Sequence, residues 1–162
     1  MEIVLSAVRP DSTDGLTALR AYAGELAARW PEKAPEPSWS DQFLADDPLA
    51  LVPPAGVFVV ARQGERVVGC GGLRYEGADV PAGAGEIKRM WVDPAVRGQG
   101  LGRRLLAYLT ELAREAGLRR LVLDTADDLL EARALYLREG FVETEPYNAN
   151  PYAHHWFTRD LW

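Results

Sequence analysis

A basic, glycine-rich segment in the middle of the chain has the composition of an anion site. It consists of Arg97, Gly98, Gln99, Gly100, Leu101, Gly102, Arg103 and Arg104. Glycines let backbone N–H groups converge on an anion, and the start of the following helix adds unpaired N–H groups and a partial positive charge. Arginines there oppose the helix dipole by about 0.3–1 kcal/mol each, which a bound anion would remove. The segment therefore predicts a phosphate site, against the plainer interpretation of a tight turn with solvated arginines.

The spacing of this segment argues against two common nucleotide sites. A nucleoside-triphosphate loop ends in Gly-Lys-Ser or Gly-Lys-Thr, and neither follows Gly102. A dinucleotide fingerprint needs a third glycine where Arg103 stands, although Asp124 lies at about the right distance for the acid that binds ribose. Residues 93–97 also separate the preceding strand from the turn. The phosphate therefore belongs to another kind of ligand.

The composition is that of a globular protein with an acidic surface. Its 162 residues suit a single domain over residues 1–162, with 48% hydrophobic and 26% charged residues. The formal net charge of −6 disfavours nucleic acid as a partner and suits a cationic small substrate. The lone cysteine, Cys70, excludes a disulfide framework and is expected to be a buried, inert thiol. Without a signal peptide or a membrane-length apolar run, we expect a cytoplasmic protein with no membrane partner.

Hydrophobic periodicity and turn residues predict alternating strands and helices. The predicted strands cover residues 3–8, 57–62, 66–74, 87–92, 121–123, 141–144 and 153–159. The predicted helices cover residues 12–29, 41–44, 100–116 and 127–139. Residues 121–123 are a continuous apolar run, as expected of a strand that is buried on both faces. This order predicts an α/β (α+β) fold, a mixed sheet with helices on its faces.

Three motifs together resemble the GNAT superfamily of acyl-CoA-dependent N-acyltransferases. The pyrophosphate motif of that family, Arg/Gln-x-x-Gly-x-Gly/Ala, matches residues 97–102. Residues 86–94 look like the family's fourth strand, and residues 134–141 look like its second motif, a helix that ends in Gly-Phe. The resemblance runs from about Val57 to Phe141. It implies a mostly antiparallel central sheet of about six to seven strands, flanked by about four helices.

The resemblance also implies which residues bind the co-substrate, acetyl-CoA. Its pyrophosphate would be held by Arg97, Gly98, Gln99, Gly100, Gly102 and Arg103. In this family the fourth strand splays from the fifth, which leaves backbone groups free for the ligand. Backbone N–H groups near Trp91 and Val92 are therefore expected to face the thioester carbonyl, where such donors stabilise developing negative charge. No metal site is expected.

Two further residues are expected to handle protons. An amine like that of lysine has a pKa of about 10.4, so its deprotonation at pH 7 costs roughly 4.6 kcal/mol and a base is useful. The resemblance places Glu86 in that role, with His154 and His155 as alternatives; neighbouring strand residues point to opposite faces, so at most one histidine can enter the site. Tyr136 is expected beside the sulfur as the acid. Proton transfer from a phenol to a thiolate is unfavourable by roughly 2 kcal/mol. The main contribution of Tyr136 would therefore be a hydrogen bond to the sulfur.

These residues predict an acetyl-CoA-dependent N-acetyltransferase that transfers an acetyl group directly to a primary amine of a small molecule. Two alternatives stay open: acetylation of a lysine or N-terminus of a protein or peptide, and a CoA-binding sensor without turnover. The aromatic and amide residues between Tyr147 and Trp156 would either border the acceptor pocket or form a surface loop. The sequence leaves open the acceptor, the acyl chain length and whether the chain forms a homodimer through an edge strand.

Overall fold

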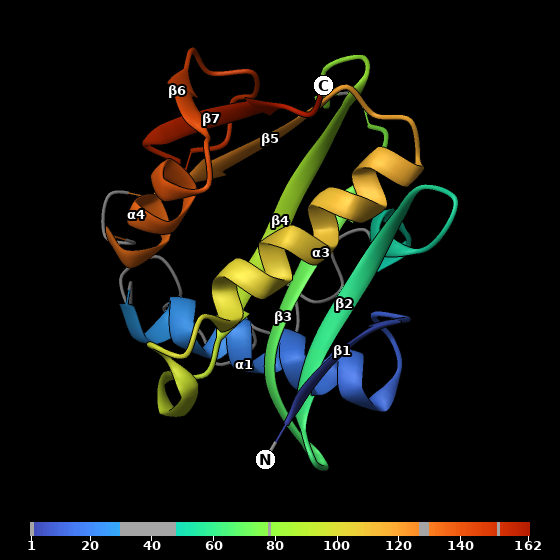
Figure 1. Cartoon of the computed structure of the whole chain (residues 1–162), viewed down its shortest axis with the longest axis vertical. Helices are drawn as coiled ribbons and strands as arrows, with labels where there is room; N and C mark the ends of the chain where they lie inside the picture. The colour runs from blue at the N-terminus through green and yellow to red at the C-terminus, as the bar shows by residue number, and fades with distance from the viewer. Residues whose placement is uncertain (1, 30–47, 78, 127–129, 152) are drawn as a thin grey trace.

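A seven-stranded sheet forms the centre of the protein (Figure 1). The computed structural model describes residues 2–29, 48–77, 79–126, 130–151 and 153–162. The strands are β1 (Ile3–Val8), β2 (Gly56–Gln63), β3 (Arg66–Arg74), β4 (Ala84–Val92), β5 (Arg120–Thr125), β6 (Val142–Thr144) and β7 (His155–Asp160). Their order across the sheet is β1-β2-β3-β4-β5-β7-β6. Only β4 and β5 are parallel among these neighbours, so the predicted mixed, mostly antiparallel sheet is confirmed.

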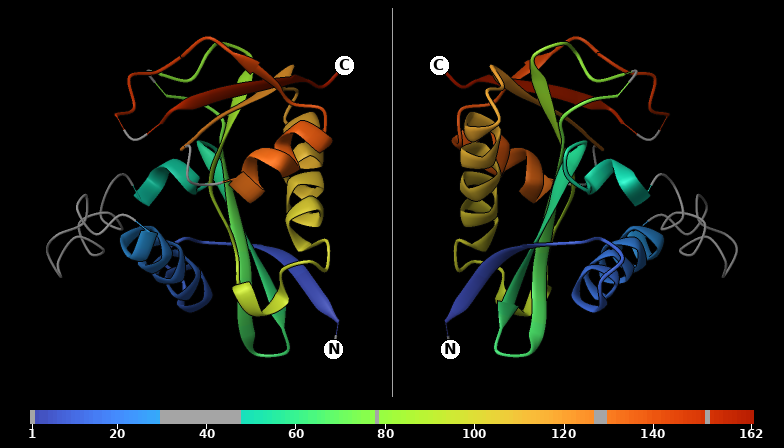
Figure 2. Two further views of the ribbon diagram at one scale, coloured as in Figure 1. Left: turned by 90° about the vertical axis from the view of Figure 1, so that its left-hand side faces the viewer. Right: turned by 90° about the vertical axis from the view of Figure 1, so that its right-hand side faces the viewer.

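Helices cover both faces of this sheet. Within the described ranges they are the α-helices α1 (Thr13–Arg29), α3 (Leu101–Glu115) and α4 (Leu130–Arg138), and the short 3₁₀ helices Pro48–Leu51 and Pro94–Val96. Figure 2 shows α1 on one face of the sheet and α3 and α4 on the other. The predicted helix at residues 41–44 lies outside the described residues. None of the described helices has the length and apolar character needed to cross a membrane.

Alternating side chains along β2 belong to two different cores, one on each face of the sheet. Val57 and Val59 pack in the same core as Leu105 of α3. Phe58 and Val60 pack in the core that contains residues of α1. Both faces of the sheet are therefore filled, and a ligand site within it needs a place where two strands separate.

The predicted boundaries that fall on described residues are confirmed to within a few residues; residues 127–129, the predicted start of the helix at 127–139, lie outside them. β1 spans the predicted range, and Ser12 caps α1, because its Oγ accepts the N–H of Gly15 at 3.1 Å. β4 begins at Ala84, earlier than predicted. The prediction began later because Gly85, next to Ala84, has the composition of a loop residue. A Cβ on Gly85 would lie only 2.7 Å from Cδ1 of Leu118. This glycine is therefore a site of close packing within the strand.

Candidate active site

β4 and β5 run side by side only briefly and then separate. Residues 84–86 of β4 pair with residues 120–122 of β5, and no pairing follows although β4 continues to Val92. A bulge in β4, where it pairs with β3, holds Arg89 at φ 59°. This left-handed conformation costs roughly 1–2 kcal/mol in a residue other than glycine. The structure thus has the separation between the fourth and fifth strands that the family resemblance implies.

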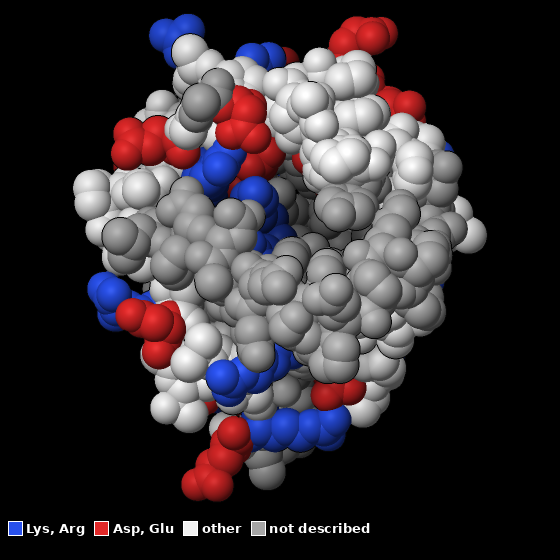
Figure 3. All heavy atoms as spheres, turned by 180° about the vertical axis from the view of Figure 1, so that it is seen from behind, with Lys and Arg blue, Asp and Glu red and all other residues white. Residues whose placement is uncertain are grey.

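A cavity of about 1460 Å³ fills the gap between β4 and β5. Its walls include Tyr22 and Leu26 of α1, on one face of the sheet, and Leu101 of α3 and Leu135 of α4, on the other. Figure 3 shows a hollow on the α1 side, with basic and acidic side chains next to each other at its edge. The cavity crosses the sheet. It exceeds the roughly 300–1,000 Å³ that is typical for one small ligand, so it has room for two substrates.

The glycine-rich loop has the backbone of an anion cradle. Gly98 has φ 83° and Gly100 has φ 77°, which favour glycine, and a Cβ on either would meet nothing within 4 Å. Gly100 caps α3 without a side-chain hydrogen bond. The N–H of Arg104 donates to the carbonyl of Gly100 as the first helical bond, so the preceding N–H groups have no partner within the helix. This loop offers both space and donors to a phosphate.

Gly102 serves the packing of the helices rather than the turn. A Cβ at this position would lie 3.1 Å from Cδ2 of Leu135 on α4 and 3.9 Å from Cγ2 of Val92 on β4. The first is tighter than an ordinary contact, so a side chain here would push α3 and α4 apart. The third glycine of the motif therefore allows α3 to pack closely against Leu135 of α4.

Two of the three arginines near the loop face the cavity. Arg97 donates through Nε to the carbonyl of Val92 at 3.1 Å and forms an ion pair with Glu25 of α1. Arg103 is largely exposed and lies 3.2 Å from Glu139. Arg104, in contrast, donates to the carbonyl of Ile3 at 2.9 Å. It therefore ties α3 to β1, and its predicted contribution to the anion site is not found.

Backbone alternation at the end of β4 decides which N–H group faces the cavity. The N–H of Asp93 donates to the carbonyl of Val68 on β3 at 2.8 Å, and the same register places Trp91 opposite Cys70. Successive N–H groups of a strand point to alternate sides. The N–H of Val92 therefore points away from β3, toward the open side of β4, and that of Trp91 points toward β3. The register favours Val92 over Trp91 as a donor to a bound ligand.

Glu86 is a buried carboxylate with several polar partners. Glu86 lines the cavity, and its side chain is 3% exposed. Oε2 accepts the hydroxyl of Tyr147 at 2.7 Å, while Oε1 lies 3.3 Å from Nη2 of Arg74 and 3.8 Å from Nζ of Lys88. Burial raises the pKa of Glu86 above its usual value, although the Tyr147 hydrogen bond and both cations oppose that rise. These contacts hold the carboxylate in one place at the edge of the cavity.

Tyr136 reaches the cavity from α4 and is held by other rings. Its side chain is 5% exposed, and its ring centroid lies 5.7 Å from that of Phe141 and 6.3 Å from that of Phe157. Burial raises the pKa of the phenol, so it keeps its proton at neutral pH. A phenol in this state can donate a hydrogen bond, but it is a weaker acid than in water.

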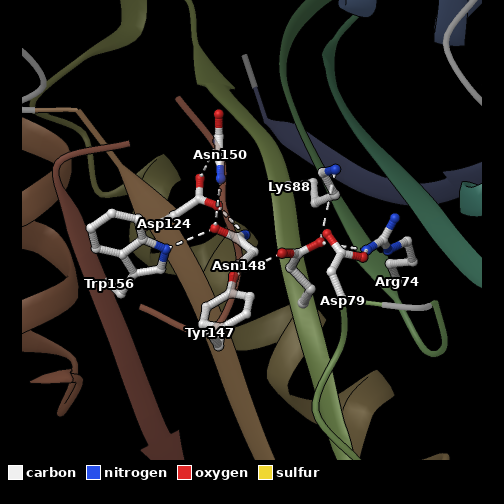
Figure 4. A network of polar contacts seen from close by, with 9 residues as sticks. Arg74, Asp79, Lys88, Asp124, Tyr147, Asn148, Asn150 and Trp156 are labelled. Atoms are coloured by element: carbon white, nitrogen blue, oxygen red, sulfur yellow. Dashed lines mark hydrogen bonds and ion pairs between the residues drawn. The ribbon is translucent and has the colours of Figure 1, made fainter. Parts of the chain in front are cut away.

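Asp124 is another carboxylate of the cavity, and neutral groups hold it (Figure 4). Its Oδ2 accepts Nδ2 of Asn148 at 2.7 Å, and its Oδ1 accepts Nδ2 of Asn150 at 3.2 Å. The carbonyl oxygen of the Asn148 side chain accepts Nε1 of Trp156 at 2.8 Å. Strand β5 and the segment before β7 therefore build one connected polar cluster beside Glu86.

Comparison with known proteins decides the family. The acetyltransferase (GNAT) family profile matches residues 19–141, most of the chain. The chain belongs to the GNAT family of acetyltransferases. A GNAT relative, an IAA acetyltransferase of Azospirillum brasilense, is 40% identical over 111 residues, which cover 68% of this chain and 69% of that protein. As a member of this family, the protein is an acetyltransferase, and GNAT acetyltransferases use acetyl-CoA.

Solved GNAT structures share the fold. An acetyltransferase of the GNAT family from Staphylococcus aureus superposes with a TM-score of 0.78 at 18% identity, over 99% of this chain and 100% of that chain. The PaiA N-acetyltransferase of Thermoplasma acidophilum, solved in complex with coenzyme A, superposes with a TM-score of 0.70 at 16% identity, over 99% of each chain. The predicted fold class is therefore confirmed by the topology of the sheet and by the solved structures that share the fold.

The cavity brings together most of the residues predicted for a GNAT site. They are Glu86, Trp91, Val92, Arg97, Gly98, Gly100, Gly102, Arg103 and Tyr136. Gln99 is exposed and is absent from the described part of the wall. His154 and His155 are also absent from it; His154 is exposed, and Nδ1 of His155 lies 3.4 Å from the carboxylate of Glu143. Glu86 therefore has the better position for a base.

Cys70 is as inert as its sequence context predicts. The thiol is fully buried on β3, and Sγ donates to the carbonyl of Arg89 at 3.2 Å. Burial raises the pKa of this thiol, which suppresses the nucleophilic thiolate. A covalent acyl-enzyme through Cys70 is therefore disfavoured.

Sequence reasoning missed three residues of the GNAT cavity and its edge. Arg74 and Tyr147 contact Glu86, and Asp124 lines the wall. The dense run of aromatic and amide residues before β7 was the available signal for Tyr147. For Arg74, no spacing indicates the contact, because it depends on the pairing of β3 with β4.

Proposed function

We propose that this GNAT enzyme transfers an acetyl group from acetyl-CoA directly to a primary amine of a small molecule. The observation that carries the proposal is the position of Glu86. It is a buried carboxylate at the point where β4 parts from β5, and it lies in the cavity that also reaches the glycine-rich loop. Acyl transfer from acetyl-CoA to an amine needs a base close to the bound thioester. The base and the loop that binds the phosphates must therefore open into the same cavity.

The glycine-rich loop supports the binding of acetyl-CoA, which supplies the thioester carbonyl. In this proposal the N–H groups around Gly98 and Gly100 contact the diphosphate, and Arg103 adds charge. Arg97 is paired with Glu25, so it would exchange that carboxylate for a phosphate. The N–H of Val92 is the candidate donor to the carbonyl oxygen as negative charge develops there.

Glu86 acts as the base in this proposal. Burial raises its pKa toward neutral pH, where a general base works best. Glu86 takes a proton from the ammonium group, directly or through water, and the neutral nitrogen attacks the carbonyl carbon. As the new N–C bond is completed, the C–S bond breaks, and the second amine proton ends on the sulfur of free CoA. Tyr136 donates a hydrogen bond to the departing sulfur.

The burial of Glu86 supports a slender acceptor. With 3% of its side chain exposed, only an amine on a narrow segment can reach it. A small amine fits this condition, a lysine on a flexible peptide is the second candidate, and a folded protein surface does not fit. The free, buried Cys70 agrees with the cytoplasm, the compartment that we propose for this reaction.

Thiol release from acetyl-CoA tests the proposed function. The protein is mixed with acetyl-CoA and, separately, with a panel of small primary amines, a lysine-containing peptide and a peptide with a free N-terminus. We expect release with at least one small amine, reduced about 10²- to 10⁴-fold by Glu86→Gln. Glu143→Gln, an exposed glutamate of β6, is the matched control and should not reduce it.

The other outcomes identify the alternatives. Thiol release with a peptide but with no small amine would establish a peptide acetyltransferase. Calorimetric binding of CoA, without thiol release from any acceptor, would establish a CoA-binding sensor. If Glu86→Gln leaves the rate of thiol release unchanged, Glu86 is not the base of this mechanism.

A further inference from the structure

We propose that Asp124 binds the ammonium group of the acceptor amine and that Trp156 positions Asp124 for this task. The inference rests on the proposed function, because it assigns the acceptor end of the same cavity. Asp124 lies on β5 two residues beyond Val122, which pairs with Glu86. Both carboxylates line the cavity where β4 and β5 have separated. An amine between them faces a binding group on one strand and a base on the other.

The carboxylate of Asp124 is held by neutral groups, unlike that of Glu86. Glu86 has cationic neighbours in Arg74 and Lys88. Asp124 takes part in none of the ion pairs found in the described ranges, and its side chain accepts hydrogen bonds from the neutral amides of Asn148 and Asn150. Asp124 is half-buried, and neutral amides satisfy part of its hydrogen-bonding capacity without neutralising its charge. A bound ammonium group would compensate that charge.

The carboxylate of Asp124 also has the capacity for this ligand. An ionised carboxylate has about four acceptor positions on its two oxygens. The amides of Asn148 and Asn150 use one position on each oxygen. The remaining positions can accept N–H donors of an ammonium group, which carries three of them.

Trp156 fixes the orientation of the amide that holds Asp124. The side-chain oxygen of Asn148 accepts both Nε1 of Trp156 at 2.8 Å and the backbone N–H of Asn150 at 3.2 Å. These two donors require the oxygen on their side, so Nδ2 of Asn148 must face Asp124. Trp156 is also directly opposite Asp124 in the register of β7 with β5. It is therefore a positioning residue that acts through Asn148.

Steady-state kinetics with Asp124→Asn test the binding role. The substitution keeps the shape of the side chain and removes its charge. With the best amine of the panel, we expect the KM for the amine to rise roughly 10- to 100-fold, the effect of losing a charged hydrogen-bond partner. The KM for acetyl-CoA should change less than about twofold, since that ligand binds at the loop of α3. A normal KM for the amine would overturn the proposal.

Two controls separate this effect from net charge and from misfolding. Asp160→Asn removes one negative charge from an exposed position at the end of β7 and should leave both KM values unchanged. Thermal unfolding checks that Asp124→Asn is folded. If it is not, Asp124→Ser is used instead and the same change in KM is expected.

A double-mutant cycle tests whether Trp156 acts through Asp124. Trp156→Phe keeps an aromatic ring and removes the Nε1 donor, so we expect the KM for the amine to rise about 3- to 10-fold. In the Asp124→Asn background the same substitution should have almost no further effect, because its target is gone. Full additivity of the two effects would overturn the positioning role, since a merely structural Trp156 predicts it.

Direct binding keeps this inference separate from the proposed function. Calorimetry with CoA-saturated protein compares 1,4-diaminobutane, 2-phenylethylamine and a lysine peptide with uncharged alcohol analogues of the two small amines. We expect heat with an amine but none with its alcohol analogue, and loss of that heat in Asp124→Asn. Such binding without turnover would contradict the proposed function and support the inference. Absence of binding by every amine, or binding that Asp124→Asn leaves intact, would overturn the inference.

Discussion

Tyr147 donates a hydrogen bond of 2.7 Å to Glu86, which joins the segment between β6 and β7 to the middle strand of the sheet (Figure 4). The phenol contacts Oε2, whereas the cations of Arg74 and Lys88 lie beside Oε1. The bond favours the charged form of Glu86, against the effect of burial. The segment between β6 and β7 thus lowers the proton affinity of the candidate base.

Tyr147→Phe should raise the pKa of Glu86 further. The variant keeps the ring but removes the hydrogen bond that stabilises the carboxylate. A base must be deprotonated to work, so the acidic limb of the kcat/KM profile should move to higher pH. The measurement is thiol release from about pH 5 to pH 9. Tyr108→Phe, on α3, is the control and should leave the limb in place. A shift to lower pH would contradict the role assigned to Tyr147.

Glu86 should also make the stability of the protein depend on pH in an identifiable direction. Its pKa in the folded state lies above the ordinary glutamate value of 4.5, because burial disfavours the charge. Glu86 therefore makes its full favourable contribution to the free energy of unfolding below pH 4.5, and this contribution is lost as the pH rises through the pKa of the folded state. Glu86→Gln removes this titration, so the variant should gain stability relative to the wild type as the pH increases. Urea unfolding at a series of pH values measures the difference. A relative gain on acidification would refute the assignment.

Local sequence predicted the backbone of the glycine-rich loop well, because that conformation depends on the glycines themselves. Gly98 and Gly100 have the positive φ that their spacing implied, and the helix begins directly after them. The side chain of Arg104 could not be assigned in the same way. Its hydrogen bond to Ile3 links residues at opposite ends of a long stretch of sequence. Only the packing of α3 beside β1 determines that contact.

The polar cluster around Asp124 was harder to predict for the same reason. Asp124 was visible as an acid that follows an apolar strand, and Asn148 as part of an amide-rich segment. Their hydrogen bond, however, depends on the antiparallel register of β5 with β7, which places Trp156 opposite Asp124. A single sequence contains no local signal for that register, so the cluster emerges only from the fold.

Gly100→Ala should weaken the binding of CoA. Gly100 has φ 77°, so alanine there costs roughly 1–2 kcal/mol, and its Cβ would enter the space above the loop. Loss of one N–H contact to a phosphate would lower CoA affinity roughly 10- to 100-fold. Calorimetry with CoA measures this change. Gly24→Ala is the matched control: that glycine is exposed in α1 with nothing within 4 Å, so alanine should stabilise the protein by about 0.5–1 kcal/mol and leave CoA affinity unchanged.

Tyr136→Phe distinguishes between two roles of the Tyr136 hydroxyl, that of a hydrogen-bond donor and that of a general acid. The ring contacts with Phe141 and Phe157 do not need the hydroxyl, so folding and CoA binding should be preserved. The loss of one donor to the developing negative charge should lower kcat by about 10²-fold. Because burial raises the pKa of Tyr136, the phenol stays protonated across the working range, and the basic limb of the pH profile should keep its position in the variant. If that limb disappears with the hydroxyl, the ionisation of Tyr136 shapes the reaction and the residue is the acid after all.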